Sequence, residues 1–145
     1  MIATTPYVRL MIRADLPACM RLEFGQREGA WTQEDWLTHC RKPNAMSYVV
    51  EDRCGLLGFL ILAINADHVE ILNFCILRGL GLGRILFENV KGHLSPDRNR
   101  VTVILPESEL SAQKGFRSAG FLAKAVLRKH FAETGEDGYL MEWRT

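Results

Sequence analysis

The first quarter of the chain shows a change from strand-like to helix-like periodicity. Tyr7 to Arg13 alternates apolar and charged residues with the two-residue period of a half-buried strand. Asp15-Leu16-Pro17 then combines a helix-capping residue with a proline in the first turn. We therefore expect a strand followed by a helix that runs to about Phe24.

A second helix is expected after the polar loop Gly25 to Ala30. Thr32 and Asp35 have the spacing of a capping box, with aspartate in the usual Glu/Gln place. The helix should continue to about Arg41, where a Lys-Pro-Asn sequence ends it.

The middle of the chain is strongly apolar and reads as three consecutive strands. These are Met46 to Glu51, Leu56 to Asn65 and Val69 to Ile76, separated by short, turn-rich segments. The longest apolar run, Leu56 to Ile64, is about half the length needed to cross a bilayer, so it predicts a buried strand. We expect an antiparallel meander and no membrane segment.

The remaining pattern predicts two further helices and three further strands. A helix over Arg84 to Leu94 should be followed by a strand at Arg100 to Leu105 and a helix from Glu109 to Ala119. Two final strands should meet at the turn region Gly135 to Gly138. With one crossover connection, this order predicts an α/β (α+β) domain with a mixed, mostly antiparallel sheet of about seven strands and four helices.

Composition narrows the class of protein. A chain of 145 residues suits one domain, here residues 1–145. Its net charge of +1 lacks the basic excess typical of nucleic-acid binding, so small molecules or proteins are the expected partners. Arg9 and Arg13 interrupt any signal-peptide core, which favours the cytoplasm, and the Cys and His spacings predict no metal site.

The most informative motif is the glycine-rich segment Arg78-Gly79-Leu80-Gly81-Leu82-Gly83, which follows a predicted strand and precedes a predicted helix. Alternate glycines permit a tight turn with exposed N–H groups, and the helix start adds unpaired donors. A diphosphate would fit there. Arg84 and Leu86 stand where a dinucleotide fingerprint needs its third glycine, and no P-loop sequence is present. A glycine-rich turn without a ligand is the alternative.

Arg-x-x-Gly-x-Gly resembles the acetyl-coenzyme A signature of the GNAT superfamily of N-acetyltransferases. Val69 to Ile76 is similar to the fourth strand of that fold, and Glu109-x-x-Ala112 with Phe116 and Gly120-Phe121 is similar to its later motif. Trp31 to Trp36 and Gly135 to Met141 resemble the ribosomal-protein-alanine N-acetyltransferase group within it.

This resemblance implies a direct attack of an amine on the thioester of acetyl-CoA. It also implies a cofactor site made of main-chain groups at the end of the fourth strand and around the glycine turn. The residues that match it are Phe74, Cys75, Ile76, Arg78, Gly79, Leu80, Gly81, Leu82, Gly83 and Arg84.

The family's acid and base positions hold residues that carry no proton. Phe116 occupies the position where the family often has a tyrosine that acts as the acid. Ile104 occupies the position of the glutamate base of bacterial ribosomal-protein members, and Glu109 that of the asparagine in the later motif. The best remaining base is Glu70, six residues before Ile76 and therefore expected on the same strand face. His68 and His130 rank below it, and nucleophilic catalysis by Cys75 is disfavoured because no histidine neighbours it in sequence.

The leading functional hypothesis is acetylation of a protein or peptide amino terminus. An α-amino group has a pKa of about 7.7 to 8.0, against about 10.4 for lysine, so a weak base suffices. The loop Gly25 to Trp31 and the acidic turn Glu133 to Asp137 are expected to frame this acceptor. The alternatives are acetylation of a small amine and a non-catalytic CoA-binding or partner-binding module, which Ile104 and Phe116 motivate. Oligomeric state is left open.

Overall fold

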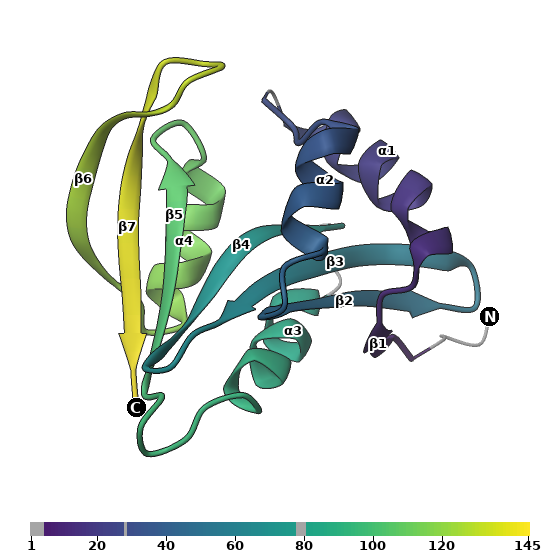
Figure 1. Ribbon diagram of the computed structural model, residues 1–145, viewed down its shortest axis with the longest axis horizontal. Coiled ribbons are helices and arrows are strands. Elements are labelled where there is room, and N and C mark those ends of the chain that lie inside the picture. Colours follow the sequence, from purple (N-terminus) through teal and green to yellow (C-terminus); the bar gives the residue numbers. More distant parts are fainter. Residues whose placement is uncertain (1–4, 28, 78–80) are drawn as a thin grey trace.

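The computed structural model describes residues 5–27, 29–77 and 81–145 and contains one seven-stranded sheet (Figure 1). The strand order is β1-β2-β3-β4-β5-β7-β6, and every neighbouring pair is antiparallel except β4 and β5. The expected mixed sheet with four flanking α-helices is confirmed for the described residues. The elements are β1 (Tyr7–Leu10), the 3₁₀ helix η1 (Arg13–Asp15), α1 (Leu16–Gln26), α2 (Gln33–Cys40), β2 (Ala45–Asp52), β3 (Gly55–Ile64), β4 (His68–Ile76), α3 (Leu82–Lys91), β5 (Arg100–Pro106), α4 (Leu110–Ser118), β6 (Leu122–Phe131) and β7 (Glu136–Arg144).

Two expected boundaries are wrong for local reasons. The first strand ends at Leu10, because Arg13 begins η1. The expected turn at Gly135 to Gly138 also lies too late in the chain, since Glu136 already pairs with Phe131 and Gly138 pairs with Pro106. The turn between the last two strands therefore lies at 132–135.

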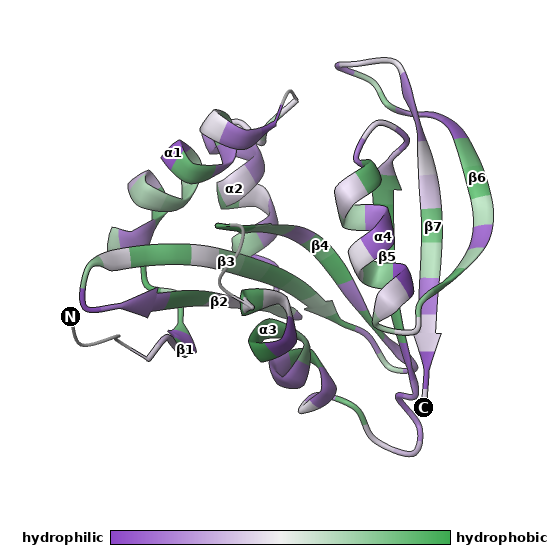
Figure 2. Ribbon diagram, turned by 180° about the vertical axis from the view of Figure 1, so that it is seen from behind, coloured by the Kyte–Doolittle hydropathy of each residue, from purple (hydrophilic) through white to green (hydrophobic). Residues whose placement is uncertain are grey.

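The sheet separates two hydrophobic cores (Figure 1). On one face, α3 contributes Leu82, Leu86 and Val90, and α4 packs Phe116 against the same cluster. On the other face, α1 and α2 cover the sheet with Cys19 and the fully buried Trp36. Figure 2 shows β3, which has a helix on each side, as a mostly apolar ribbon, as expected for a strand buried on both faces.

The sheet divides between β4 and β5. Their parallel ladder runs only from His68 opposite Arg100 to Ile71 opposite Val103, after which the two strands diverge (Figure 1). The end of β4 continues to pair with β3 but not with β5. We call the region between the end of β4 and β5 the sheet opening.

A β-bulge lies at the start of this opening. The pairing of β3 with β4 shifts between Ile61 and Leu62, which leaves Leu72 as an extra residue in β4. An extra residue reverses which side chains face which side of the sheet. Accordingly, Ile71 packs in the core under α3 and α4, whereas Leu72 packs in the core under α1 and α2.

No helix within the described ranges combines the length and the apolar character that crossing a membrane requires.

Candidate functional site

The described part of the predicted glycine turn lies at the amino terminus of α3. Gly81 is the N-cap residue with φ 66°, a left-handed conformation that favours glycine, and it has no side chain to cap the helix. Leu82 is buried and anchors the turn, while Gly83 and Arg84 are exposed. Arg78, Gly79 and Leu80 lie outside the described residues. The start of α3 thus presents main-chain donors and a cation to solvent.

A cavity of about 1230 Å³ extends from this helix start along the sheet opening to α4. Predicted cofactor residues from both segments line it: Phe74, Cys75, Ile76, Gly83 and Arg84. Its walls also include Leu86 and Phe87 of α3 and Phe116 of α4. A long groove with apolar walls and a cationic end is suited to a large ligand with a charged head and an apolar arm.

The peptide groups at the end of β4 face the sheet opening in alternation. Leu57 and Leu77 form a hydrogen-bonded pair, with Leu77 N–H donating to Leu57 C=O at 2.9 Å. In an antiparallel ladder the pairs alternate, so the peptide groups of Phe74 and Ile76 point away from β3 and those of Cys75 point toward it. Phe74 and Ile76 therefore present main-chain groups to the opening.

Arg27, the C-cap residue of α1, reaches these groups. Its Nη2 donates to the C=O of Phe74 at 2.6 Å, and its Nη1 donates to Oδ1 of Asn73 at 2.9 Å. The same Oδ1 accepts from the N–H of Phe74 at 2.9 Å. Both main-chain polar groups of Phe74 are thus bonded within the protein, whereas the family role carried over from the sequence requires them to meet the cofactor.

Glu23 organises this network from beneath the sheet. It is 1% exposed and accepts from Nδ2 of Asn73 at 2.8 Å and from the N–H of Trp31 at 3.1 Å. Burial raises the pKa of its carboxyl group, and the hydrogen bond from Asn73 and the charge of Arg27 oppose that rise. Asn73 and Glu23 are the two buried polar side chains of the described residues, and they are bonded to each other.

Glu70 lies half-buried in β4, between Ala63 of β3 and Thr102 of β5. The expectation that it shares a face with Ile76 is wrong, because the bulge at Leu72 reverses the alternation between them. Ile76 packs in the core under α3 and α4, whereas Glu70 lies on the face of α1 and α2, where its charge acts on His39.

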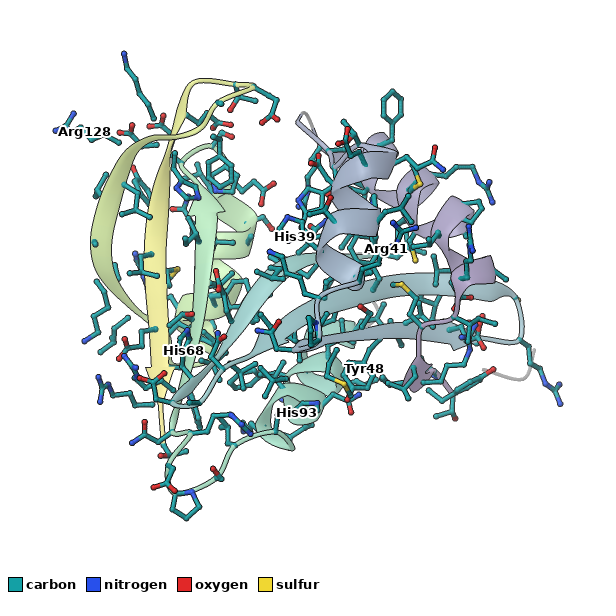
Figure 3. The ribbon with its side chains drawn as sticks, viewed as in Figure 1. His39, Arg41, Tyr48, His68, His93 and Arg128 are labelled. Atoms are coloured by element: carbon teal, nitrogen blue, oxygen red, sulfur yellow. The ribbon has the colours of Figure 1, made fainter. Side chains whose placement is uncertain are left out.

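His39 of α2 is close enough to Glu70 to interact with its charge, and it packs against Trp31. Their rings stack at a centroid distance of 4.5 Å, and Figure 3 shows His39 on the side of α2 toward β5. Burial lowers the pKa of His39, and the charge of Lys42 adds to that effect. The imidazole is therefore mostly neutral at neutral pH.

Among the other acid and base positions from the sequence, Phe116 lines the cavity, whereas Ile104, His68 and His130 do not. Ile104 lies in β5 opposite Leu140, and Phe116 packs edge-on against Phe74 at 5.2 Å. His68 bonds with Asp67 at the start of β4, where β4 still pairs with β5, and His130 lies in the exposed strand β6. The hydroxyl group of Tyr48 in β2 bonds to His93 at 2.7 Å beyond α3, away from the opening, and is therefore not placed to act as an acid there (Figure 3).

Cys75 is buried and its thiol lies 3.2 Å from Oε1 of Gln26, and burial raises the pKa of this thiol to about 11. A thiol of that acidity is mostly uncharged and a poor nucleophile at neutral pH. Within the described residues, no group of three or more His, Cys, Asp or Glu side chains is arranged to hold a metal ion.

Sequence reasoning missed Arg27, Glu23 and Asn73. Each had an ordinary context in its own segment, and the contact between α1 and β4 spans 46 residues. The signal in the sequence was Asn73, a polar residue in the apolar second half of the strand, since a buried polar side chain requires a partner.

No protein-family model matches the chain. A curated protein of Bacillus subtilis (strain 168), named "Putative [ribosomal protein bS18]-alanine N-acetyltransferase", is 26% identical over 147 residues, which cover 98% of this chain and 97% of that protein. The solved ribosomal-protein-S18-alanine N-acetyltransferase from Escherichia coli superposes with a TM-score of 0.84 at 17% identity, covering 97% of this chain and 94% of the other. Spermidine N-acetyltransferase from Vibrio cholerae, in complex with CoA and spermine, superposes with a TM-score of 0.74 at 18% identity over 96% of this chain and 95% of the other.

Proposed function

We propose that this chain, which has the fold of the GNAT N-acetyltransferases, transfers the acetyl group of acetyl-CoA to the amino terminus of a protein or peptide. The comparisons confirm the expected GNAT fold, and the name of the curated relative supports the expected acyltransferase class. The observation that carries the proposal is the continuous cavity that joins the start of α3, the end of β4 and α4.

Acetyl-CoA would be held mainly by main-chain groups. The glycine turn would receive the diphosphate, with donors from Gly81, Leu82 and Gly83 and a positive charge from Arg84. We extend this role to Arg78, Gly79 and Leu80, which adjoin the turn in sequence. Because the diphosphate is anionic and the helix start is positive, this end of the cavity sets the direction in which the cofactor binds.

The acyl arm would then follow β4 into the sheet opening. Ile76 presents its peptide groups there, and Phe74 lines the same wall with its ring. The main chain of Cys75 faces β3, so Cys75 would contribute only as part of the strand wall. This arrangement would place the thioester where β4 leaves β5.

The acceptor amine would approach from the face of α1 and α2. Glu70 lies on that face, which suits a base that takes the proton of the ammonium group, directly or through water. The α-amino group needs little help, because a fair fraction is already neutral near its pKa of about 8. The amine then attacks the thioester carbon, and the tetrahedral oxyanion expels the CoA thiolate.

The acidic turn offers less to the acceptor than its sequence implies. The carboxylate of Glu136 accepts from the N–H of Ser108 at 3.0 Å, and that of Asp137 accepts from the N–H of Lys129 at 2.8 Å. These two carboxylates fasten the loop before α4 and the strand β6. Glu133 remains exposed and is the better candidate for attracting a cationic acceptor.

A second candidate function is acetylation of a small polyamine. The fold shared with the Vibrio cholerae enzyme, which was solved with spermine, supports it because a fold fixes the cofactor site better than the acceptor site. The third candidate is a CoA-binding module without catalysis, which Phe116 and Ile104 still motivate.

The test combines calorimetry with acetyl-CoA and a thiol-release assay on peptides with different amino-terminal residues, with spermine alongside. We expect binding of acetyl-CoA and turnover on a subset of peptides. Turnover on spermine alone would favour the second function, and binding without any turnover would favour the third. Absence of binding would refute the cofactor site itself.

The role of Glu70 is tested in the same assay by Glu70→Gln, with Glu34→Gln on the exposed side of α2 as the control. We expect Glu70→Gln to lower kcat by about 10²-fold, since general bases contribute about 10²–10⁴-fold, and to flatten the acid side of the pH profile. An unchanged profile would remove Glu70 from the mechanism.

A further inference from the structure

The guanidinium group of Arg27 lies in the sheet opening itself. The C=O of Phe74 points away from β3 into this opening, and Nη2 of Arg27 donates to it at 2.6 Å. The guanidinium carbon also lies 5.6 Å from the centre of the Phe74 ring, whose edge contacts Phe116. Arg27 therefore lies over Phe74, whose ring packs in turn against Phe116, the residue at the family's frequent tyrosine position.

Arg27 is held in this position from both sides of the opening. Oδ1 of Asn73 accepts from Nη1, and Asn73 is itself fixed by the buried carboxylate of Glu23. On the far side, Glu109 precedes α4 and places a carboxylate oxygen 3.5 Å from Nε. A side chain tied to α1, β4 and the start of α4 is oriented before any ligand binds.

Arg27 forms ion pairs with two carboxylates, but neither of them takes a short hydrogen bond from its guanidinium group. Its short hydrogen bonds, at 2.6 and 2.9 Å, go to neutral oxygen atoms, whereas the carboxylates of Glu23 and Glu109 both lie at 3.5 Å. Guanidinium has five N–H donors and stays protonated, so it can still stabilise an anion that forms in the opening.

The other cations of the cavity serve its other parts. Among the described lining residues, these cations are Arg84 and Lys91. Arg84 lies at the start of α3, and Lys91 lies at its end, where it pairs with Glu88 and covers the ring of Phe87. Arg27 is the lining cation that the structure brings to the end of β4.

We propose that Arg27 is a catalytic residue that stabilises the thiolate leaving from acetyl-CoA, in place of an acid. This inference rests on the proposed function. The amine forms the new C–N bond and its proton passes to a base or to water. The C–S bond breaks, its electron pair stays on sulfur, and the resulting thiolate pairs with the guanidinium without receiving a proton.

The test compares the wild-type chain with Arg27→Gln and Arg27→Lys, with the exposed Arg21→Gln on α1 as the matched control. Calorimetry measures the affinity of each for CoA and for desulfo-CoA, which lacks the sulfur. The ultraviolet absorbance of the thiolate, as the difference between these two complexes, gives the pKa of the bound CoA thiol. Thiol release from acetyl-CoA gives kcat.

We expect the wild-type chain to hold the pKa of the bound CoA thiol below that of free CoA. Arg27→Gln should return it to the free value and lower kcat by about 10²-fold, as for loss of one preorganised charge donor. Its affinity for desulfo-CoA should stay within about twofold of wild type. Arg27→Lys should keep part of the effect, and Arg21→Gln all of it.

Three results would overturn the proposal. An equal thiol pKa in wild type and Arg27→Gln would show that Arg27 does not act on sulfur. An equal loss of affinity for CoA and desulfo-CoA would assign Arg27 a structural role, with the acetyltransferase function intact. Failure of the wild-type chain to bind either compound would refute the proposed function and this inference with it.

Discussion

Two buried polar residues, Glu23 and Asn73, position the polar groups of the candidate site. Glu23 and Asn73 lie in an apolar interior, where an unpaired polar group costs about 1–3 kcal/mol, and each is the other's main partner. Their bond orients Arg27 toward the sheet opening. The sequence shows Asn73 as a polar residue among apolar neighbours but does not reveal its partner, because helix and strand periodicity describe one element at a time.

The buried carboxyl group of Glu23 makes stability depend on pH. Burial raises its pKa in the folded state above the ordinary value of 4.5. At pH values between the unfolded-state pKa and the folded-state pKa, the native state therefore holds a proton that the unfolded state has released. The contribution of Glu23 is therefore greatest below pH 4.5 and decreases as pH rises, by at most about 1.4 kcal/mol per pH unit.

Glu23→Gln removes this titration. We expect the variant to lose stability at every pH through altered hydrogen bonding, but to lose less at pH 7 than near pH 4.5. Urea unfolding of both proteins across this range measures the difference, with the exposed Glu34→Gln as the control. A loss that grows with pH would mean that Arg27 keeps Glu23 charged in the folded state.

At the scale of elements, periodicity predicted the order of strands and helices well, because each strand and helix has its own apolar pattern. The capping box of α2 is confirmed, with Thr32 accepting from the N–H of Asp35 at 3.1 Å. The bulge at Leu72 could not be predicted, since the mostly apolar segment Val69 to Ile76 has too few polar positions to fix which of its residues share a face. Only pairing with β3 reveals the reversal that separates Glu70 from Ile76.

Close packing of β3 against the end of β4 depends on Gly58. A Cβ at this position would lie 2.6 Å from the C=O of Cys75 and 2.8 Å from Cγ2 of Ile76. Gly58→Ala should therefore displace the wall of the sheet opening, destabilise the fold by about 1–3 kcal/mol and weaken binding of acetyl-CoA.

Gly25→Ala is the matched control, because nothing lies within 4 Å of the added methyl group and Gly25 is inside α1. It should stabilise the protein by about 0.5–1 kcal/mol and leave binding unchanged. Thermal unfolding and calorimetry measure both effects. Equal affinity of Gly58→Ala and wild type for acetyl-CoA would show that the end of β4 does not shape the cofactor site.

The whole molecule consists of two arms that share one short ladder. Strands β1 to β4 form one arm and β5 to β7 the other, and only four residue pairs join them between β4 and β5. The divergence of β4 from β5 could be anticipated only through the family resemblance, since the sequence of one strand does not show where the neighbouring strand stops pairing with it. The candidate site occupies the open end, so the closed end must hold the arms in register.

Arg98 fastens this closed end through main-chain oxygen atoms. Its Nε donates to the C=O of Asn65 at 2.6 Å and its Nη1 to the C=O of His93 at 3.1 Å, which ties the turn between β3 and β4 to the segment after α3. Arg100 lies nearby but pairs mainly with Asp67, whose side chain is 64% exposed.

These contacts predict unequal effects for two neighbouring arginines. Arg98→Ala removes the partners of two part-buried carbonyl groups and should cost about 1–3 kcal/mol of unfolding free energy. Arg100→Ala breaks an exposed pair and should cost less than about 1 kcal/mol. Urea unfolding measures the loss of stability in both variants.

Saturating acetyl-CoA should raise the free energy of unfolding of each variant by the same increment as in wild type, because neither arginine lines the cavity. A smaller increment for Arg98→Ala would instead mean that loosening the closed end also changes the open end, so that the register of the two arms, and not only the side chains of the opening, sets the affinity for the cofactor.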